Sequence, residues 1–124
     1  MEVLIIDDDS DDCLVMSELL RDLIPGVSCT IVESGEEAIK YLRQPVNVPQ
    51  IIFLDIHMTG MDGKDTLLKI KGMKSYSRSR VIMYSGQTND HERLIYQKLG
   101  ANGFILKTGS REQLKSDIRS AVSG

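Results

Sequence analysis

The sequence predicts an α/β domain in which helices cover both faces of one parallel sheet. Three observations predict this class: a length of 124 residues, a composition with 41% hydrophobic and 27% charged residues, and short apolar runs that alternate with amphipathic stretches. Alternation of this kind requires parallel strands joined by crossover helices. The composition is not that of a disordered chain, and no apolar run approaches the roughly 20 residues that cross a bilayer.

Each strand is predicted from a short run rich in apolar or β-branched residues. A wholly apolar run, such as residues 3–6 or 51–54, is typical of a strand that is buried on both faces. The expected strands lie at residues 3–6, 29–33, 51–54, 81–84 and 102–106.

Each helix is predicted from an apolar stripe and from signals at its ends. Ser10 is expected to cap the first helix, which residues 25–26 (Pro-Gly) end, and residues 34–37 form a capping box for the second. Gly100 is expected to end the fourth helix, and Ser110 to cap the fifth. The expected helices span residues 10–24, 34–43, 64–71, 88–99 (or 89–99) and 110–122.

Five parallel strands with right-handed crossovers leave few topologies. The commonest is the flavodoxin-like doubly wound sheet with the strand order 2-1-3-4-5. The chain has no internal repeat, low-complexity segment or interdomain linker, so we expect one domain over residues 1–124. Ligands bind such sheets beyond the carboxyl ends of the strands, where the strand order reverses. Functional residues are therefore expected at that edge.

Charge is distributed unevenly along the chain. The net charge is −3, but residues 1–62 contain 13 acidic and 3 basic residues, whereas residues 63–124 contain 5 acidic and 12 basic ones. Adjacent carboxylates, such as those of residues 7–9, repel one another unless a cation offsets them. The acidic balance argues against non-specific binding of nucleic acid. We interpret the basic stretch within residues 64–80 as a solvated face, with a partner surface for an acidic target as the alternative.

Two features predict a cytoplasmic location. The first six residues lack the basic leader of a signal peptide. Cys13 and Cys29 occur without a CxxC motif or a Cys/His cluster, which is typical of buried thiols in a reducing compartment and not of a disulfide or a metal site.

Polar residues directly follow four of the predicted strands: residues 7–9 (all Asp), Asp55, Ser85 and Lys107. Neighbouring strands lie about 4.8 Å apart, so the first acids and Asp55 should converge on one small volume that suits Mg²⁺. Ser85 could donate a hydrogen bond there, and Lys107 would reach back across two strands, roughly 10 Å. Each residue alone could be an ordinary turn, cap or surface charge. Their coincidence at one edge favours a site for phosphoryl chemistry on a carboxylate.

Four strings in the sequence point to a known family. They are residues 3–9 with the acidic pair, 53–63 with a central Asp, 84–86 with a hydroxyl, and 103–107 with an aromatic residue and a lysine. In this order and spacing the chain resembles, over essentially its whole length, the receiver domain of two-component response regulators. That resemblance implies the same flavodoxin-like fold that the periodicity predicts.

The resemblance also implies a phosphoacceptor and a cofactor. Asp55 would be the nucleophile that takes a phosphoryl group from a sensor histidine kinase or a phosphotransfer protein and forms an aspartyl phosphate. Asp8 and Asp55 would bind Mg²⁺ directly, and Asp7 would act mostly through water. The backbone carbonyl of His57 would complete the protein ligands.

Further residues have implied roles in charge neutralisation and switching. Lys107 and Ser85 would stabilise the phosphoryl oxygens. Movement of Ser85 toward the phosphoryl group would leave space for Phe104 to turn, which would alter the surface of the fourth helix, fifth strand and fifth helix for a downstream protein. His57 and Gln87 stand where side chains influence the attack of water on the phosphoryl group.

Taken together, the resemblance implies a stand-alone phosphoswitch and not a turnover enzyme. No output domain is expected in the chain, because nothing follows the last predicted helix. The implied partners are proteins, with no direct binding of nucleic acid and no membrane, and a homodimer is compatible with the family.

The chain departs from the usual family pattern at three positions. Thr108 follows the lysine where the family usually has a cis proline, and a cis bond before another residue is costly. We therefore expect a rearranged loop or a strained bond after Lys107. Thr59 also replaces a proline, and Gly86 replaces the more typical alanine, so both loops should be less constrained.

Other functions have less support. A phosphorylation-independent binding module of the same fold is favoured by Thr59 and Thr108, but the complete set of site residues opposes it. A hydrolase of the haloacid dehalogenase type would need a nucleophile after the first strand and a second Asp two residues on. Asp7 and Asp9 fit this only formally, and the chain is too short for the usual cap and core. FMN or nucleotide binding would need a phosphate loop that is absent from the sequence.

Overall fold

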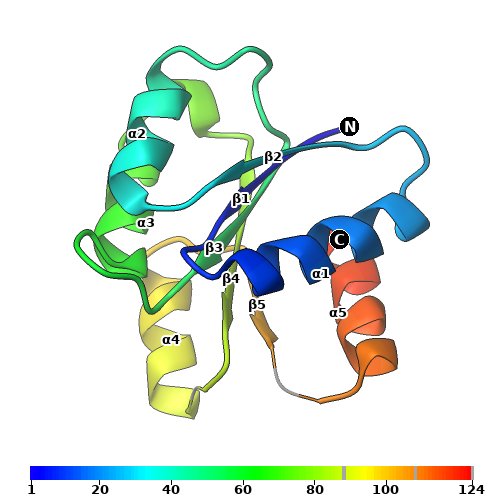
Figure 1. The fold of residues 1–124 in the computed structure, drawn as a ribbon. Coiled ribbons are helices and arrows are strands. Elements are labelled where there is room, and N and C mark those ends of the chain that lie inside the picture. The colour runs from blue at the N-terminus through cyan, green and yellow to red at the C-terminus, as the bar shows by residue number, and fades with distance from the viewer. Residues whose placement is uncertain (88, 108, 124) are drawn as a thin grey trace.

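Five parallel strands form one sheet in the predicted order, β2-β1-β3-β4-β5. The computed structural model describes residues 1–87, 89–107 and 109–123 (Figure 1). The strands are β1 (Glu2–Ile6), β2 (Ser28–Val32), β3 (Ile51–Asp55), β4 (Arg80–Ser85) and β5 (Gly103–Leu106). The chain winds outward from β1 to β2 and then returns to β3 on the other side of β1, so the strand order reverses between β1 and β3.

Helices cover both faces of this sheet. Their bounds are α1 (Ser10–Leu23), α2 (Gly35–Arg43), α3 (Gly63–Lys71), α4 (Asp90–Lys98) and α5 (Arg111–Ser123), with a short 3-10 helix, η1, at Lys74–Tyr76. Figure 1 shows α2, α3 and α4 on one side of the sheet and α1 and α5 on the other. The predicted α/β class is confirmed. Within the described part of the chain, every helix is too short or too polar to cross a membrane.

Strand residues alternate between two hydrophobic cores because successive side chains point to opposite faces of a sheet. On β1, Leu4 and Ile6 belong to the core beneath α2, α3 and α4, whereas Val3 and Ile5 belong to the core beneath α1 and α5. All four side chains are buried. Residues 3–6 of this strand are continuously apolar because neither of its faces meets water there.

The cap of the first helix differs from the prediction. Asp9, and not Ser10, is the N-cap of α1, and its side chain accepts hydrogen bonds from the backbone N–H groups of Asp11 and Asp12. Asp and Ser are both good caps, but the charged carboxylate also interacts favourably with the positive end of the helix dipole. Ser10 therefore becomes the first residue of the helix.

The other predicted helix ends are close to those observed. Ser34 and Ser110 cap α2 and α5 through their hydroxyl oxygens. Asn89 caps α4, and the alternative start at Thr88 lies outside the described residues. After α4, Gly100 has a φ of +106°, a left-handed conformation that glycine adopts without strain.

The burial of one cysteine also differs from the prediction, because β2 is an edge strand. Cys13 is buried as expected, but Cys29 on β2 is only half-buried, and both thiols are free. β2 lies at the end of the strand order, so one of its sides has no neighbouring strand and its residues reach solvent. The sequence pattern of a strand does not distinguish this edge position from a central one.

Candidate functional site

Four polar side chains at the carboxyl ends of the strands lie on one face of the sheet. Asp7, Asp55, Tyr84 and Lys107 each stand two residues after a strand residue of the core beneath α1 and α5. Because side chains alternate with a period of two, all four point toward this same face. Asp55 on β3 is also the register partner of Tyr84 on β4. The topology thus gathers four distant chain segments in one place.

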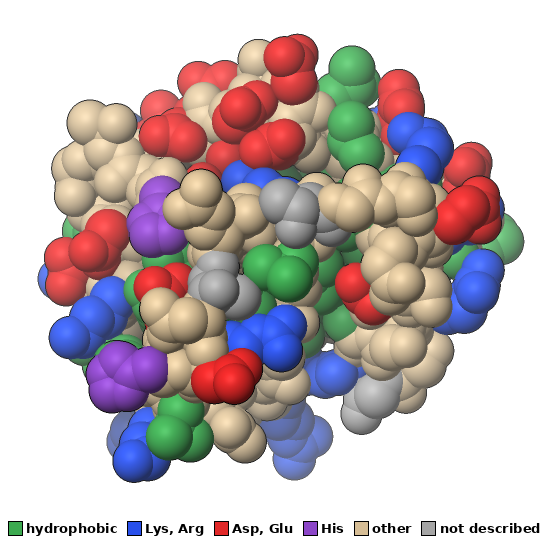
Figure 2. Space-filling model, turned by 90° about the horizontal axis from the view of Figure 1, so that it is seen from below, with side chains coloured by type: hydrophobic (Ala, Val, Ile, Leu, Met, Phe, Trp, Pro, Cys, Tyr) green, Lys and Arg blue, Asp and Glu red, His purple; other side chains and the backbone are tan. Residues whose placement is uncertain are grey.

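Three carboxylates meet at this place. Ligand oxygens of Asp7, Asp8 and Asp55 all lie within 4.8 Å of one another. Asp7 and Asp55 are buried, whereas Asp8 is exposed. Figure 2 views the molecule from the end at which the strands terminate, and acidic side chains gather along one side of it. Carboxylate oxygens with access to water fit Mg²⁺, which binds a few protein oxygens and keeps several water ligands.

Lys107 offsets part of this negative charge. Its Nζ lies 3.0 Å from Asp7 Oδ2, 3.3 Å from Asp55 Oδ1 and 2.9 Å from Asp12 Oδ2. Burial by itself would lower the pKa of Lys107, but hydrogen bonds from its ammonium group to Asp12 and Asp7 raise the pKa above its usual value. Lys107 therefore remains a cation and, as predicted from the strand spacing, reaches Asp55 from two strands away.

Asp55 has a perturbed acidity. Burial raises the pKa of Asp55 to about 6; Lys107 opposes this shift and the charge of Asp7 adds to it. The backbone N–H of His57 donates a hydrogen bond to Asp55 Oδ1 at 3.4 Å, while the His57 side chain is exposed. A cation placed among the three carboxylates would favour the ionised form of Asp55.

The loop that follows Asp55 is held by acidic side chains. The N–H of Thr59 donates to Asp8 Oδ2 at 3.4 Å, a bond that proline, the residue usual in the resembled family, could not make. The N–H of Met61 donates to Glu36 Oε1 at 3.2 Å. At Gly63 a Cβ atom would lie 2.6 Å from the carbonyl oxygen of Asp55, so only glycine lets α3 begin this close to the site.

Ser85 is on the opposite side of β4 from the carboxylates. The preceding residue on its side, Met83, belongs to the core beneath α2, α3 and α4. The Ser85 hydroxyl donates to the backbone carbonyl of Gln87 at 2.7 Å and accepts from the N–H of the same residue at 3.2 Å. In this conformation the buried Ser85 hydroxyl is therefore engaged within its own loop, and the side chain of Gln87 is exposed.

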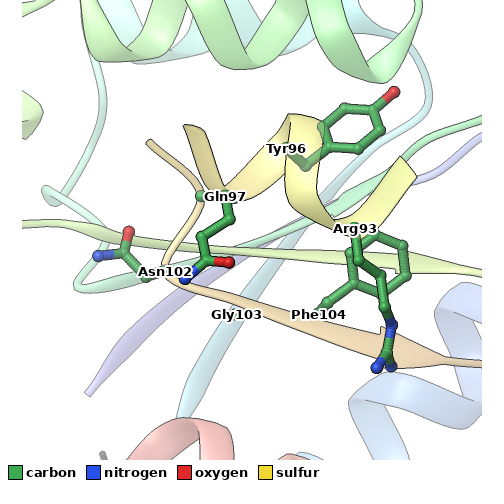
Figure 3. A pocket seen from close by; sticks show the side chains of 7 residues that line it. Arg93, Tyr96, Gln97, Asn102, Gly103 and Phe104 are labelled. Atoms are coloured by element: carbon green, nitrogen blue, oxygen red, sulfur yellow. The ribbon is translucent and has the colours of Figure 1, made fainter. Parts of the chain in front are cut away.

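Phe104 borders a cavity of about 410 Å³ between α4 and β5 (Figure 3). Its half-buried ring lies 6.3 Å from the ring of Tyr96, and Arg93 Cζ lies 5.1 Å from its centroid. Figure 3 shows the Arg93 side chain alongside the Phe104 ring and the Tyr96 hydroxyl pointing away from it. The aromatic ring thus borders open volume that is also lined by the cation stacked on it, Arg93.

Comparison with known proteins identifies the family. The profile of the response regulator receiver domain family matches residues 3–119 of the chain. The chain belongs to this family. It is a receiver domain of the kind found in two-component response regulators, and the predicted resemblance is confirmed.

Relatives of this receiver domain include longer regulators and solved structures. Transcriptional regulatory protein CpxR of Escherichia coli K12 is 26% identical over 121 residues, which is 98% of this chain and 49% of CpxR. The chain therefore spans about half the length of the curated relatives it matches first. The phosphorylated cyanobacterial phytochrome response regulator RcpA is 25% identical, with a TM-score of 0.86 and coverage of 96% of this chain and 89% of RcpA. The Mn²⁺-bound form of response regulator Rcp1 is 21% identical, with a TM-score of 0.85 and coverage of 98% and 91%.

Two residues at the site of this receiver domain were not predicted from the sequence. Asp12 was not assigned to the site, but its carboxylate pairs with Lys107. Tyr84 was not singled out, yet its hydroxyl donates a 2.6 Å hydrogen bond to Asp7 Oδ2. A signal for Tyr84 was present, because a tyrosine within a buried apolar strand requires a partner for its hydroxyl.

One predicted feature of the receiver domain is not described. The expectation of a rearranged or strained bond after Lys107 concerns Thr108, which lies outside the described residues.

Proposed function

We propose that this receiver domain accepts a phosphoryl group on Asp55 from a phosphohistidine of a sensor histidine kinase or phosphotransfer protein. The observation that carries the proposal is the placement of Asp55. It is buried at the end of the central strand β3, has Asp7 and Asp8 as neighbouring carboxylates, and lies 3.3 Å from Lys107 Nζ. The related regulator RcpA is phosphorylated, which supports the same chemistry in this chain.

In the proposed reaction a carboxylate oxygen of Asp55 attacks phosphorus as the P–N bond to the donor imidazole breaks. The imidazole nitrogen keeps the electron pair of that bond and takes a proton from solvent, and Asp55 becomes an aspartyl phosphate. Lys107 would pair with one phosphoryl oxygen, since its Nζ already contacts Asp55. When bound by Asp7, Asp8, Asp55 and the backbone carbonyl of His57, Mg²⁺ would neutralise charge on the phosphoryl oxygens.

The proposed output is a change on the opposite side of β4. Ser85 would exchange its bond to Gln87 for a bond to a phosphoryl oxygen, and Phe104 would turn into the space that Ser85 leaves. This would reshape the surface of α4, β5 and α5 for a downstream protein. The exposed side chains of His57 and Gln87 would set the rate at which water removes the phosphoryl group.

In this proposal the chain is a signalling module and not a turnover enzyme. Residues 1–124 would act as one receiver unit in the cytoplasm, where thiols such as those of Cys13 and Cys29 stay reduced. CpxR is named a transcriptional regulator, but the chain matches only 49% of it, so the proposal takes from CpxR the receiver chemistry alone.

The test is intact mass spectrometry after incubation with acetyl phosphate, with Mg²⁺ or with EDTA. We expect the wild-type chain to gain one phosphoryl group only when Mg²⁺ is present, and Asp55→Asn to gain none. Asp65→Asn is the matched control, because it removes an exposed carboxylate on α3, outside the cluster of Asp7, Asp8 and Asp55. It should be phosphorylated like the wild type.

Two results would contradict the proposal. A phosphoryl gain that persists in Asp55→Asn would assign the acceptor to another residue. No gain by the wild type, even in samples taken within seconds, would favour the phosphorylation-independent binding module.

A further inference from the structure

Tyr84 occupies an unusual place for a residue of a buried strand. Its side chain is 1% exposed, and its hydroxyl donates a 2.6 Å hydrogen bond to Asp7 Oδ2. Lys107 Nζ lies 4.5 Å from the centroid of the Tyr84 ring, and the Phe53 ring meets it edge-on at 6.4 Å. Tyr84 therefore contacts the carboxylate through its hydroxyl and the ammonium group through its ring.

The two oxygens of Asp7 have different partners among the described residues. Oδ2 accepts from the Tyr84 hydroxyl and from Lys107 Nζ, at 2.6 and 3.0 Å. Oδ1 accepts one bond, of 2.9 Å, from the N–H of Asp9. A carboxylate oxygen can accept about two bonds, so Oδ2 is saturated and Oδ1 keeps capacity for a water molecule or a cation.

The packing of the Tyr84 ring does not require the hydroxyl group. Phenylalanine would occupy the same space between Phe53 and Lys107 but would leave Oδ2 with one donor fewer. The Tyr84 hydroxyl is the donor of its 2.6 Å bond to Asp7 Oδ2, because a carboxylate oxygen accepts.

We propose that Tyr84 is a positioning residue for the metal site: by donating to Oδ2 beside Lys107, its hydroxyl fixes the orientation of the Asp7 carboxylate and leaves Oδ1 as the oxygen with capacity for a cation. The proposal rests on the proposed function, because it concerns the same site and the same Mg²⁺. Residues that hydrogen-bond to metal ligands commonly orient them, and their loss lowers metal affinity by about 10- to 100-fold.

The test measures the affinity of the whole chain for Mg²⁺ alone by isothermal titration calorimetry. In Tyr84→Phe we expect the dissociation constant for Mg²⁺ to rise about tenfold or more. Tyr76→Phe is the matched control, because the buried hydroxyl of Tyr76 donates to the carbonyl of Leu42 in the other core. Urea unfolding without Mg²⁺ compares the stability of the two variants, and the control should bind Mg²⁺ like the wild type.

The outcomes show whether this inference alone, or the proposed function as well, has failed. Weaker binding in Tyr84→Phe alone, at a stability similar to that of Tyr76→Phe, would support the inference. Unchanged binding in Tyr84→Phe, or equal weakening in both variants, would overturn it and leave the proposed function intact. If the wild type binds no Mg²⁺, both are overturned. Should Tyr84→Phe fail to fold, Tyr84→Met removes the hydroxyl with a flexible apolar side chain and is judged by the same criteria.

Discussion

At the carboxyl edge of the sheet, the side chains on the two faces are held by different interactions. On the face toward α1 and α5, ion pairs and hydrogen bonds already connect Asp7, Asp55, Tyr84 and Lys107. On the face toward α2, α3 and α4, the Ser85 hydroxyl is bonded to its own loop and half-buried Phe104 borders a cavity. The first face is organised around charged side chains, whereas the second holds a hydroxyl bonded within its own loop and an aromatic ring beside open volume.

The proposed phosphoryl chemistry therefore lies on one face and the proposed switch on the other, although their residues are close in the sequence. Tyr84 and Ser85 are consecutive on β4, yet they point to opposite faces because of the alternation of a strand. Tyr84 contacts Asp7 and Lys107, and Ser85 contacts Gln87. A change at Asp55 could therefore pass from one face to the other through a single strand.

The largest expected effect is a loss of stability when the Lys107 cation is removed from the face toward α1 and α5, which we call the charged face. Loss of one partner of a buried ion pair costs about 3–5 kcal/mol. Because the Lys107 side chain is 17% exposed, we expect Lys107→Met to lower the free energy of unfolding by an amount near the lower end of that range. Mg²⁺ should restore part of the loss, since it would offset the same carboxylates.

Urea unfolding with and without Mg²⁺ checks this prediction. Lys98→Met, which removes an exposed lysine on α4, is the control and should change stability little. Equal stability of the two variants would mean that Lys107 does not hold the charged face together.

The second expected effect is a pH dependence that also belongs to the charged face. Burial raises the pKa of Asp55 from 3.8 to about 6. Between these two pH values the folded state keeps a proton that the unfolded chain has released. The stabilisation from this proton is complete below about pH 4 and is lost as the pH rises through about 6. The two pKa values correspond to about 3 kcal/mol in total.

Asp55→Asn carries no charge at any pH and should lack this loss. Without Mg²⁺, the wild type should therefore become less stable relative to Asp55→Asn between pH 4 and pH 8. Urea unfolding across this range measures the difference, and a difference that does not vary with pH would contradict the prediction.

The third expected effect concerns the other face. Ser85→Ala removes the 2.7 and 3.2 Å hydrogen bonds to Gln87 and should cost about 1 kcal/mol of unfolding free energy. The amide of Gln87 should also exchange faster with deuterated solvent, because its acceptor is lost. Unchanged exchange at Gln87 would show that the Ser85 hydroxyl is not what holds this loop.

The smallest expected effect is the release of the Phe104 ring. Arg93→Ala removes the cation over that ring, an interaction worth about 0.5–1 kcal/mol at an exposed site. NMR should show faster reorientation of the Phe104 ring, while Arg119→Ala on α5 should leave the ring unchanged. Identical ring dynamics in both variants would show that Arg93 does not restrain the Phe104 ring.

Much of this protein could be predicted from its sequence because the decisive signals are local. Apolar runs and helix caps predicted the strands and helices, and the parallel topology placed Asp55 beside Asp7 and Asp8. Even the reach of Lys107 followed from strand spacing. The cap of α1 was predicted one residue too late because Asp9 and Ser10 are both good caps.

Only the tertiary structure decided which side chains complete the site. Tyr84 meets Asp7, and Asp12 meets Lys107, because strand register and the position of α1 bring residues together that lie 77 and 95 positions apart. The half-exposed state of Cys29 depends likewise on the edge position of β2. The sequence by itself determined the fold and the acidic centre, since periodicity and topology depend on backbone geometry. The partners of that centre depend on side-chain contacts in three dimensions, which no local pattern encodes.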